Sequence, residues 1–541
     1  MWNKSNWFYL QIILFLFSIL SCNKDINQTI ELSIKSPVNN WVFDEDSEIL
    51  FVANMKSNSL IWESSIDGYL GTGTQIKSKL SSGTHTIYVK FEEYSLSSET
   101  QVFVRSNEES KTSKKLITSL PLNITNCNDK KIGLLSLDNT TNDISVYVEE
   151  DVSELESTES LELRNIKFQI ELDILNPDIK TVKARTILNN EEKSIYVMNT
   201  ISSYLEPHEI YIKRYYSSEN LTVWIPIDFA EDMCLIDECI ENVENIIISR
   251  ISNLWGKCAD INSDGTFSLI FTGTINDEKV ALGFFNPSDF FVRDKESNPY
   301  SNEMDVLYVA IPQKESETYS VSSISATIAH ELTHAVNFTS KTWKRKKLGC
   351  ENVQQEELFL DEGWSHLSET LCGFGISGGN IDFMKYFLNN TKDYSFCESD
   401  YLGRSDSVGQ RGAMSLFLYW LFCKAGGFNN GGVDFLKSMT TSDTYGWECI
   451  GEFFNISTDK LLMNFFSEFF EKEISEIFDL ELKDLATGEF YITDMNMKSY
   501  NVTEISKILP KSFISFYSES EEPVFIDSSD SPENLYLYRE R

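Results

Sequence analysis

Two histidines with a glutamate between them have the residue types and the spacing that zinc-assisted hydrolysis needs. His330 and His334 are four positions apart, so both imidazoles lie on one face of a helix and can reach one point. Imidazole nitrogens are common zinc ligands, and two of them supply half of a tetrahedral shell. Glu331 follows the first histidine and is placed to take a proton from an attacking water. The pattern H-E-x-x-H therefore indicates a zinc site with Glu331 as general base.

The residues around this pattern predict the helix that it requires. Ser322 or Ser323 can cap the start of the helix. Apolar side chains then recur at helical spacing and predict a buried face: Ile324, Ile328, Leu332 and Val336. Because the whole chain contains only five histidines, a chance match to the pattern is rare.

A catalytic zinc site takes a third protein ligand and keeps one position open. Positions 337 and 340 are Asn and Ser, which excludes a third histidine six residues after the second. Glu362, on a second helix that returns to the first, is the expected third ligand. Glu369 lies two helical turns further along the same face. Glu369 either contacts a ligating histidine and orients it without binding the metal itself, or is a solvated charge on the helix surface.

With these residues in place, the chain resembles the gluzincin metallopeptidases, and among them the hyicolysin-type neutral zinc peptidases. The resemblance covers roughly residues 221–440, and its strongest segments are 329–338 and 360–369. Further segments look like strands and turns of that family: 259–265, 282–285 and 306–309. The resemblance implies a zincin-type domain in which His330, His334 and Glu362 hold Zn²⁺ and protein or peptide is the substrate.

The resemblance also implies a side chain that stabilises the oxyanion, and the sequence leaves its identity open. Arg411, Tyr401 and His366 have suitable chemistry. Two positions depart from the family pattern. Asp361 stands where Asn is common, and Arg411 precedes Gly-Ala where an aromatic residue is expected.

Two further features of this region have alternative interpretations. Asp260, Asn262 and Asp264 with Gly265 match the opening of a calcium loop, but the twelfth position is Phe271, so an Asx-type turn is favoured over calcium.

Strands are expected at 280–285 and 305–311. In peptidases of this build, an edge strand above the zinc helix pairs with the substrate backbone, and either strand is a candidate.

Composition limits the class of protein. The chain has 541 residues, 41% of them hydrophobic and 13% aromatic, which supports several folded domains. The formal net charge is −37, which argues against nucleic acid or an anionic membrane surface as the main partner.

The first 21 residues have the pattern of a lipoprotein signal peptide. An apolar run from 8 to 20 ends in Leu20-Ser21-Cys22, similar to a bacterial lipoprotein cleavage box. This predicts a lipid anchor at Cys22 and a location in the bacterial cell envelope, periplasmic-facing or surface-exposed.

The chain has ten cysteines, and nine remain if Cys22 carries the lipid, so at least one has no disulfide partner within the chain. An exported chain permits disulfides, but the sequence does not give their pairing.

Strand patterns dominate the part of the chain before the zinc region. Trp62, then Asp67-Gly68 and Gly71-Thr72-Gly73, resemble bacterial immunoglobulin-like modules, in which His85 lies in a strand and has a structural role. His208 follows a proline in an expected turn and is assigned no role. The fold class is therefore multidomain α+β, with a zincin-type catalytic domain of mixed sheet and active-site helices preceded by β-sandwich modules.

The expected organisation is the following: 1–21 signal peptide, 22–33 tether, 34–105 immunoglobulin-like β-sandwich, 106–115 linker, 116–221 β-rich domain, 222–478 zinc metallopeptidase domain and 479–541 small β cap. The sequence thus predicts a membrane-anchored zinc endopeptidase. The alternative is a surface-binding lipoprotein whose zinc site is structural or inactive. An intact Glu331 favours the enzyme, because a structural site has no need of that base.

Overall fold

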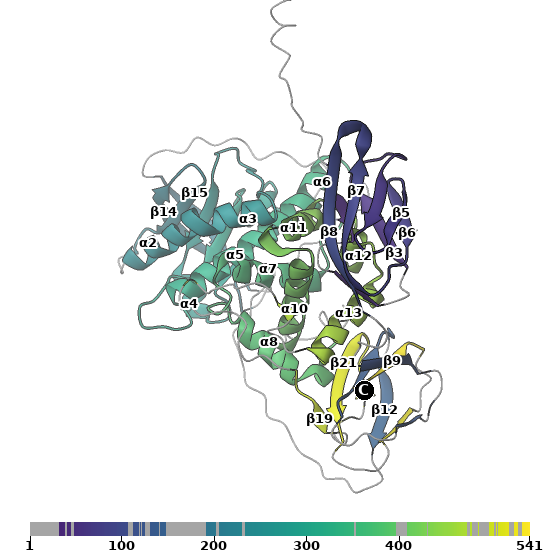
Figure 1. The fold of residues 1–541 in the computed structure, drawn as a ribbon. Coiled ribbons are helices and arrows are strands. Elements are labelled where there is room, and N and C mark those ends of the chain that lie inside the picture. The colour runs from purple at the N-terminus through teal and green to yellow at the C-terminus, as the bar shows by residue number, and fades with distance from the viewer. Residues whose placement is uncertain are drawn as a thin grey trace, which may run out of the picture.

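The chain folds into a helical core with an open β-sheet on one side and two smaller β units (Figure 1). The computed structural model describes residues 32–105 with gaps at 38–40 and 45–47, parts of 112–147, 191–396 with gaps at 202–204, 230–232 and 351–352, 408–472 except 430, and parts of 477–540. The predicted signal peptide and the lipidation site at Cys22 lie outside these residues.

The N-terminal unit consists of two sheets, ordered β1-β3-β6 and β2-β8-β7-β4-β5. Its strands are β1 Ile34–Ser36, β2 Trp41–Asp44, β3 Ile49–Ala53, β4 Ile61–Ser64, β5 Gly68–Thr72, β6 Gln75–Ser78, β7 Gly83–Phe91 and β8 Leu96–Arg105. Buried and half-exposed positions alternate along β3, β4 and β7, as expected for strands with one face on a core. His85 is buried in β7 and bonded to Ser64 and to the carbonyl of Ser81, which is a structural role.

The second β unit joins segments that are far apart in the sequence. It contains β9 Thr112–Leu116, β10 Leu122–Ile124, β11 Ile132–Ser136, β12 Asn142–Tyr147, β19 Tyr500–Asn501, β20 Lys507–Ile508, β21 Ser512–Tyr517, β22 Val524–Ser528 and β23 Leu535–Glu540. Early and late strands pair in two sheets, β10-β22-β12-β20 and β19-β21-β11-β23-β9. In Figure 1 the blue strands β9 and β12 lie among the yellow strands. The expected C-terminal cap thus shares its sheets with residues 112–147, and residues 112–115 of the expected linker are in a strand.

In the later part of the expected β-rich domain at 116–221, the described strands belong to the central sheet, while residues 148–190 lie outside the described residues. That sheet has the order β13-β14-β15-β16-β18-β17. Its strands are β13 Glu192–Val197, β14 His208–Ser217, β15 Leu221–Pro226, β16 Phe267–Phe271, β17 Gly283–Phe285 and β18 Val306–Val309. β15, β16 and β18 are parallel, while β17 runs antiparallel on the edge. The parallel strands are buried almost throughout, as strands covered on both faces must be.

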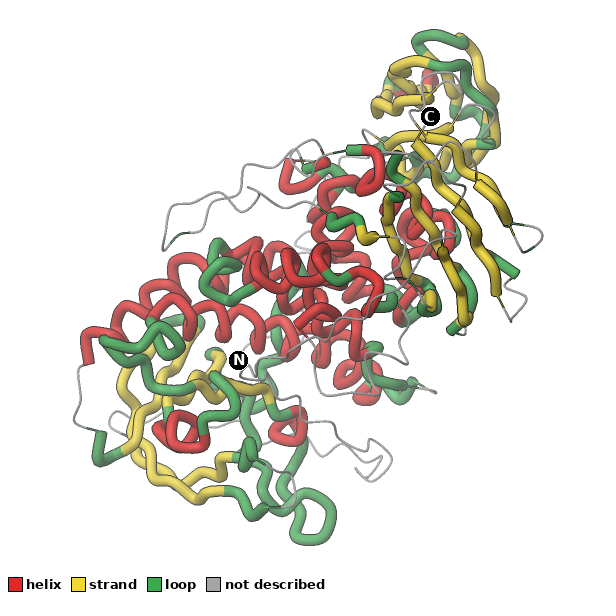
Figure 2. Tube along the Cα trace, turned by 90° about the horizontal axis from the view of Figure 1, so that it is seen from below, coloured by secondary structure: helices red, strands yellow, loops and turns green. Residues whose placement is uncertain are grey.

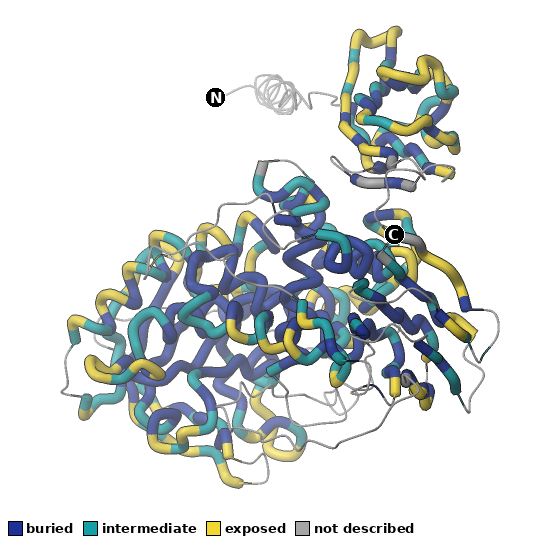
Figure 3. Tube along the Cα trace, turned by 60° about the horizontal axis from the view of Figure 1, so that its bottom comes forward, coloured by how far each residue is buried: buried dark blue, intermediate teal, exposed yellow. Residues whose placement is uncertain are grey.

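Helices form the layer between these strand regions (Figure 2). They are α2 Met233–Asn242, a π-helical turn Val243–Ile247, α3 Ile248–Leu254, α4 Gly273–Glu278, α5 Val321–Asn337, a second π-helical turn Phe338–Trp343, α6 Lys344–Lys347, α7 Leu358–Cys372, α8 Asn380–Asn389, α10 Val408–Lys424, α11 Gly432–Thr441, α12 Gly446–Phe454 and α13 Thr458–Glu471. Figure 3 shows the buried residues concentrated in these helices. Among the described residues, no helix combines the length and the apolar character needed to cross a bilayer.

Aromatic side chains attach both β units to the helices. Trp41 of β2 lies with its ring centroid 5.8 Å from Trp420 of α10 and 5.5 Å from Phe454 of α12. On the other unit, Phe513 of β21 stacks on Phe466 of α13 at 4.8 Å. Such buried aromatic contacts contribute more than their area alone. The three parts therefore pack as one molecule around the helical core.

Candidate metal centre

Helix α5 carries the H-E-x-x-H pattern through the middle of the molecule. Its N-cap is Ser320, whose hydroxyl accepts a hydrogen bond from the backbone N–H of Ser323, so the expected cap at Ser322 or Ser323 was wrong. The helix is buried along nearly its whole length, with His330 and His334 at 0% and 5% exposure. It packs against β17 and β18 on one side and α7 on another. The histidines therefore face α7 inside the protein.

Helix α7 brings Glu362 to both histidines. Oε2 of Glu362 lies 3.4 Å from Nε2 of His330, and Oε1 lies 3.6 Å from Nε2 of His334. Atoms bound to one tetrahedral zinc lie roughly 3.3–3.6 Å from each other, given bonds of about 2.0–2.2 Å. Glu362 thus lies at a ligand-like separation from each of the two histidine nitrogens, and the three side chains are donor types that zinc takes.

A carboxylate contacts the Nδ1 atom of each histidine and so orients the ring. Oε1 of Glu369 lies 2.6 Å from Nδ1 of His330, and Oδ2 of Asp361 lies 3.1 Å from Nδ1 of His334. Asn337 in turn donates to the other oxygen of Asp361 at 2.6 Å. A carboxylate on Nδ1 fixes the ring and leaves Nε2 for a metal. Glu369 is therefore a buried partner and not a solvated charge, and the role of Asp361 was missed because it was treated only as a departure from a family pattern.

The charges around His330 favour a positive charge at this point. Burial alone would lower the pKa of His330, but the carboxylates of Glu362 and Glu369 raise it to about 10. Burial would likewise raise the pKa of Glu369, and its bonds to His366 and His330 lower it. A raised imidazole pKa means that a cation is stabilised here, which a proton or a metal ion can supply.

Glu331 is held beside this cluster by the edge strand. The backbone N–H of Phe285 in β17 donates to Oε2 of Glu331 at 3.0 Å. Glu331 is 2% exposed, and burial raises its pKa above the usual value. A hollow of about 20 Å³ is lined by Glu331, His334 and Asn337 among others, which is enough for one water. A raised pKa and space for water suit a group that accepts a proton.

His366 is a third imidazole next to the predicted ligands. Its Nδ1 lies 3.0 Å from the same Glu369 oxygen that holds His330, and burial lowers its pKa. One potential ligand atom from each of His330, Glu362 and His366 lies within 4.8 Å of the others. His334 is outside this particular group, although its Nε2 is close to Glu362. The cluster therefore contains more imidazole than the sequence prediction used.

Of the three residues considered for stabilising the oxyanion, the structure describes Arg411 and His366. Arg411 is buried near the start of α10, where its guanidinium lies 5.5 Å from the ring centroid of Phe383, and its charge contributes to lowering the pKa of His366. Tyr401 lies outside the described residues. His366 has its Nδ1 engaged by Glu369, which leaves an acceptor and not a donor at Nε2 while the ring is neutral.

The loop at Asp260 is a closed turn. The carboxylate of Asp260 accepts from the backbone N–H groups of Asp264 and Gly265, at 3.1 Å each. Asn262 donates to Asp264 at 2.8 Å. These oxygens cap the loop backbone, which agrees with the Asx-type turn that the sequence favoured.

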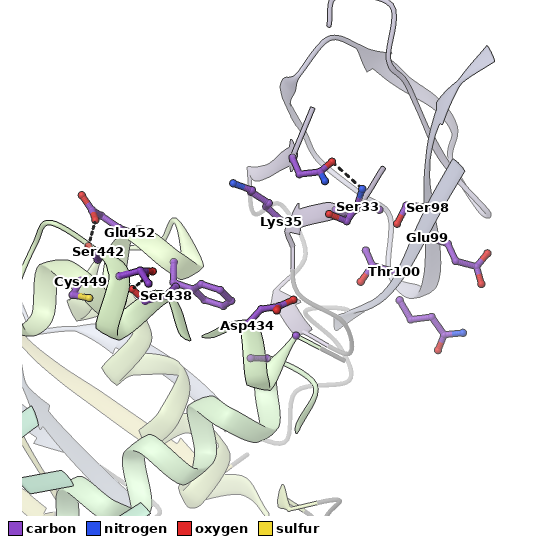
Figure 4. A pocket seen from close by; sticks show the side chains of 17 residues that line it. Ser33, Lys35, Ser98, Glu99, Thr100, Asp434, Ser438, Ser442, Cys449 and Glu452 are labelled. Carbon is purple, nitrogen blue, oxygen red and sulfur yellow. Dashed lines mark hydrogen bonds between the residues drawn. The ribbon is translucent and has the colours of Figure 1, made fainter. Parts of the chain in front are cut away.

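A much larger hollow, of about 1310 Å³, lies between the N-terminal β unit and the helices. Figure 4 shows Ser33 and Lys35 on one side and Asp434, Ser438 and Cys449 on the other. Its lining is mixed polar and apolar and contains none of the residues of the metal centre. Among the described residues, Glu331 and His334 thus line the smaller hollow beside α5 and not this one.

Comparison with known proteins identifies one distant relative among curated sequences. The chain is 25% identical over 160 residues to the neutral metalloprotease ShpI of Staphylococcus hyicus, a match that spans 29% of this chain and 35% of the relative. The match thus covers about a third of that protein's length. It supports a distant relationship to a metalloprotease. No protein-family model matches the chain.

Two solved structures align with the chain at low TM-scores. Fibronectin(III)-like modules of Clostridium thermocellum CbhA align with a TM-score of 0.13 and 18% identity, over 22% of this chain and 69% of theirs. A Salmonella alpha-2-macroglobulin reacted with methylamine aligns with a TM-score of 0.10 and 8% identity, over 94% of this chain and 40% of its own.

Proposed function

We propose that this chain is a zinc-dependent endopeptidase that cleaves peptide bonds in protein substrates. One observation carries the proposal: Glu362 lies 3.4 Å and 3.6 Å from the Nε2 atoms of two histidines four residues apart, with a buried glutamate between those histidines in the sequence. The distant relationship to a neutral metalloprotease supports the same activity. We further propose that the helices and the central sheet form a zincin-type catalytic domain.

In this proposal His330, His334 and Glu362 hold zinc, with Glu369 and Asp361 fixing the two rings through their Nδ1 atoms. Zinc supplies a Lewis acid that polarises the scissile carbonyl and lowers the pKa of water. Glu331 accepts the proton of the attacking water and passes it to the leaving amine. The bond from the N–H of Phe285 holds Glu331 in place for both transfers.

The central sheet offers one edge for a peptide substrate next to this site. β18 lies between β16 and β17, so both its sides are already paired. β17 is the last strand of the sheet, packs on α5 and bonds Glu331 through Phe285. Of the two strands that the sequence left open, β17 is therefore the one to which an extended peptide can add as a further strand. Substrate bound there would lie beside the proton acceptor.

We also propose that the enzyme is anchored in the bacterial envelope through a lipid on Cys22. The support is the pattern of apolar run and Leu-Ser-Cys at residues 8–22. Substitution Cys22→Ala in the full chain tests it. The wild type should sediment with the membrane fraction and incorporate labelled fatty acid, and the variant should do neither. Equal membrane recovery of both proteins would overturn the anchor.

The activity is tested with Glu331→Gln. The wild type should cleave casein, and a chelator should abolish cleavage. The variant should keep its zinc content and lose at least 100-fold in activity, because the amide cannot accept the proton. Glu192→Gln, an exposed position on β13, is the matched control and should keep full activity. Cleavage by the Glu331→Gln protein at the wild-type rate would refute the assignment of the base.

A further inference from the structure

His366 is a buried imidazole that the proposed mechanism does not use. It is 1% exposed and lies on α7 one helical turn after Glu362. Its Nδ1 is 3.0 Å from Oε1 of Glu369, while its Nε2 has no hydrogen-bond partner among the described residues. Leaving a buried acceptor unpaired costs on the order of 1–3 kcal/mol. One ring nitrogen of His366 is held by a carboxylate while the other has no hydrogen-bond partner among the described residues, and this difference requires an explanation.

The contact with Glu369 defines what the free nitrogen can do. A carboxylate oxygen only accepts hydrogen bonds, so the proton of the neutral ring is on Nδ1 and a lone pair is on Nε2. His330 has its Nδ1 on the same oxygen, and its Nε2 faces Oε2 of Glu362 at 3.4 Å. Glu369 therefore holds the Nδ1 atoms of two imidazoles, as a carboxylate commonly does for histidines that bind a metal through Nε2.

The position of His366 matches this preparation. Its ring centroid lies 4.7 Å from that of His330, which is as close as the 4.8 Å between His330 and His334. Potential ligand atoms of His330, Glu362 and His366 lie within 4.8 Å of one another. His330 and Glu362 belong to both possible ligand sets, so His366 lies beside the two side chains that His334 also approaches.

We propose that Nε2 of His366 is a fourth protein ligand of the metal, in addition to His330, His334 and Glu362. This inference rests on the metal site of the proposed function and goes beyond its ligand set. The small hollow beside Glu331 and His334 is not lined by His366, so the side from which water reaches Glu331 stays open. Because zinc can expand to five ligands, a fourth protein ligand is compatible with catalysis.

X-ray absorption at the zinc edge of the full chain loaded with one zinc tests the proposal. The scattering pattern of imidazole should fit three histidines in the wild type and two in His366→Ala. His208→Ala is the matched control, because His208 also pairs with a carboxylate, Glu278 at 2.8 Å, but begins strand β14 of the central sheet. The control should keep three. Zinc affinity should fall 10- to 100-fold in His366→Ala and stay unchanged in the control.

Two imidazoles in the wild type, or equal zinc affinity of wild type and His366→Ala, would overturn the fourth ligand. The wild-type spectrum decides the question even when the variant fails to fold. The outcome is separate from the proposed function. If the spectrum shows two imidazoles and a chelator abolishes cleavage, the proposed peptidase activity stands and the fourth ligand is wrong. If the spectrum shows three imidazoles and the protein does not cleave, the fourth ligand stands and the proposed activity is wrong.

Discussion

Glu369 and His330 are joined by a contact of 2.6 Å between Oε1 and Nδ1, and this contact links helix α7 to helix α5 at the metal centre. Both side chains are buried, at 2% and 0% exposure. The carboxylate also reaches His366, so one side chain sets the orientation of two imidazoles. Glu369 therefore orients one imidazole on α5 and one on its own helix.

Glu369→Gln should weaken zinc binding by 10- to 100-fold, since the amide is a poorer acceptor and no longer fixes the two rings. Titration of the chelator-stripped protein with zinc measures the change. Glu278→Gln is the control, because Glu278 holds His208 outside the centre and its substitution should leave zinc affinity unchanged. Equal affinity of Glu369→Gln and the wild type would show that the contact does not prepare the ligands.

Gly378→Ala should disturb the centre without touching any ligand. A Cβ at Gly378 would overlap Oε2 of Glu369, although the backbone of this glycine does not itself require glycine. The clash should cost roughly 1–3 kcal/mol in the free energy of unfolding and also lower zinc affinity. Denaturant unfolding and zinc titration measure the two effects.

The control for this substitution is Gly273→Ala in α4. There the nearest atom to a new Cβ is Cδ1 of Ile311 at 3.8 Å, which is ordinary van der Waals contact. Stability and zinc affinity should both stay close to the wild type. A Gly378→Ala protein that behaves like this control would contradict the tight packing of the loop on Glu369.

The arrangement of the site could be predicted from sequence as far as helical spacing determines it. His330 and His334 share a face because they are four residues apart, and Glu369 lies on the Glu362 side of α7 because it is two turns away. The contact of Asp361 with His334 depends on how α5 and α7 pack, whereas His366 and Glu369 are three residues apart on α7 itself. A single sequence does not contain that packing, so the role of Asp361 was missed, whereas the spacing of His366 and Glu369 on one helix was visible and was not used.

The limits of the β units could not be predicted for a related reason. Strands 112–147 and 500–540 have ordinary strand patterns, and nothing local indicates that they pair with each other across more than half of the chain. Strands 192–217 extend the central sheet through backbone bonds of β14 to β15. Strand partners depend on long-range hydrogen bonds, whereas the alternation of apolar residues specifies only which face is buried.

A buried ion pair under α7 should be important for stability. Nζ of Lys341 lies 2.7 Å from Oε2 of Glu356, and both side chains are at most 1% exposed. Lys341→Met leaves Glu356 as an uncompensated buried charge and should cost about 3–5 kcal/mol in the free energy of unfolding. Lys77→Met is the control, because its pair with Glu48 is about 60% exposed on both sides and should be worth at most about 1 kcal/mol. Chemical denaturation of the two variants compares the costs, and similar losses would contradict the difference.

Asp289 should make the stability of the protein depend on pH near neutrality. Its carboxyl is fully buried, and accepts from the N–H of Asn302 at 2.6 Å and from the hydroxyl of Tyr308 at 2.7 Å. Burial raises its pKa from 3.8 to about 7, while these hydrogen bonds oppose the shift. The folded state therefore prefers the protonated form, so the stabilising contribution is full below pH 3.8 and is lost as the pH rises through about 7.

Asp289→Asn, which resembles the protonated carboxyl in shape and charge, should remove this part of the pH dependence. Urea unfolding of wild type and variant between pH 5 and 8.5 measures it. The wild type should lose on the order of 2–4 kcal/mol relative to the variant as the pH rises through about 7. Asp305, whose pKa burial raises to about 8, titrates in both proteins, so its contribution cancels in the difference. Parallel curves for the two proteins would mean that Asp289 is ionised in the folded state throughout this range.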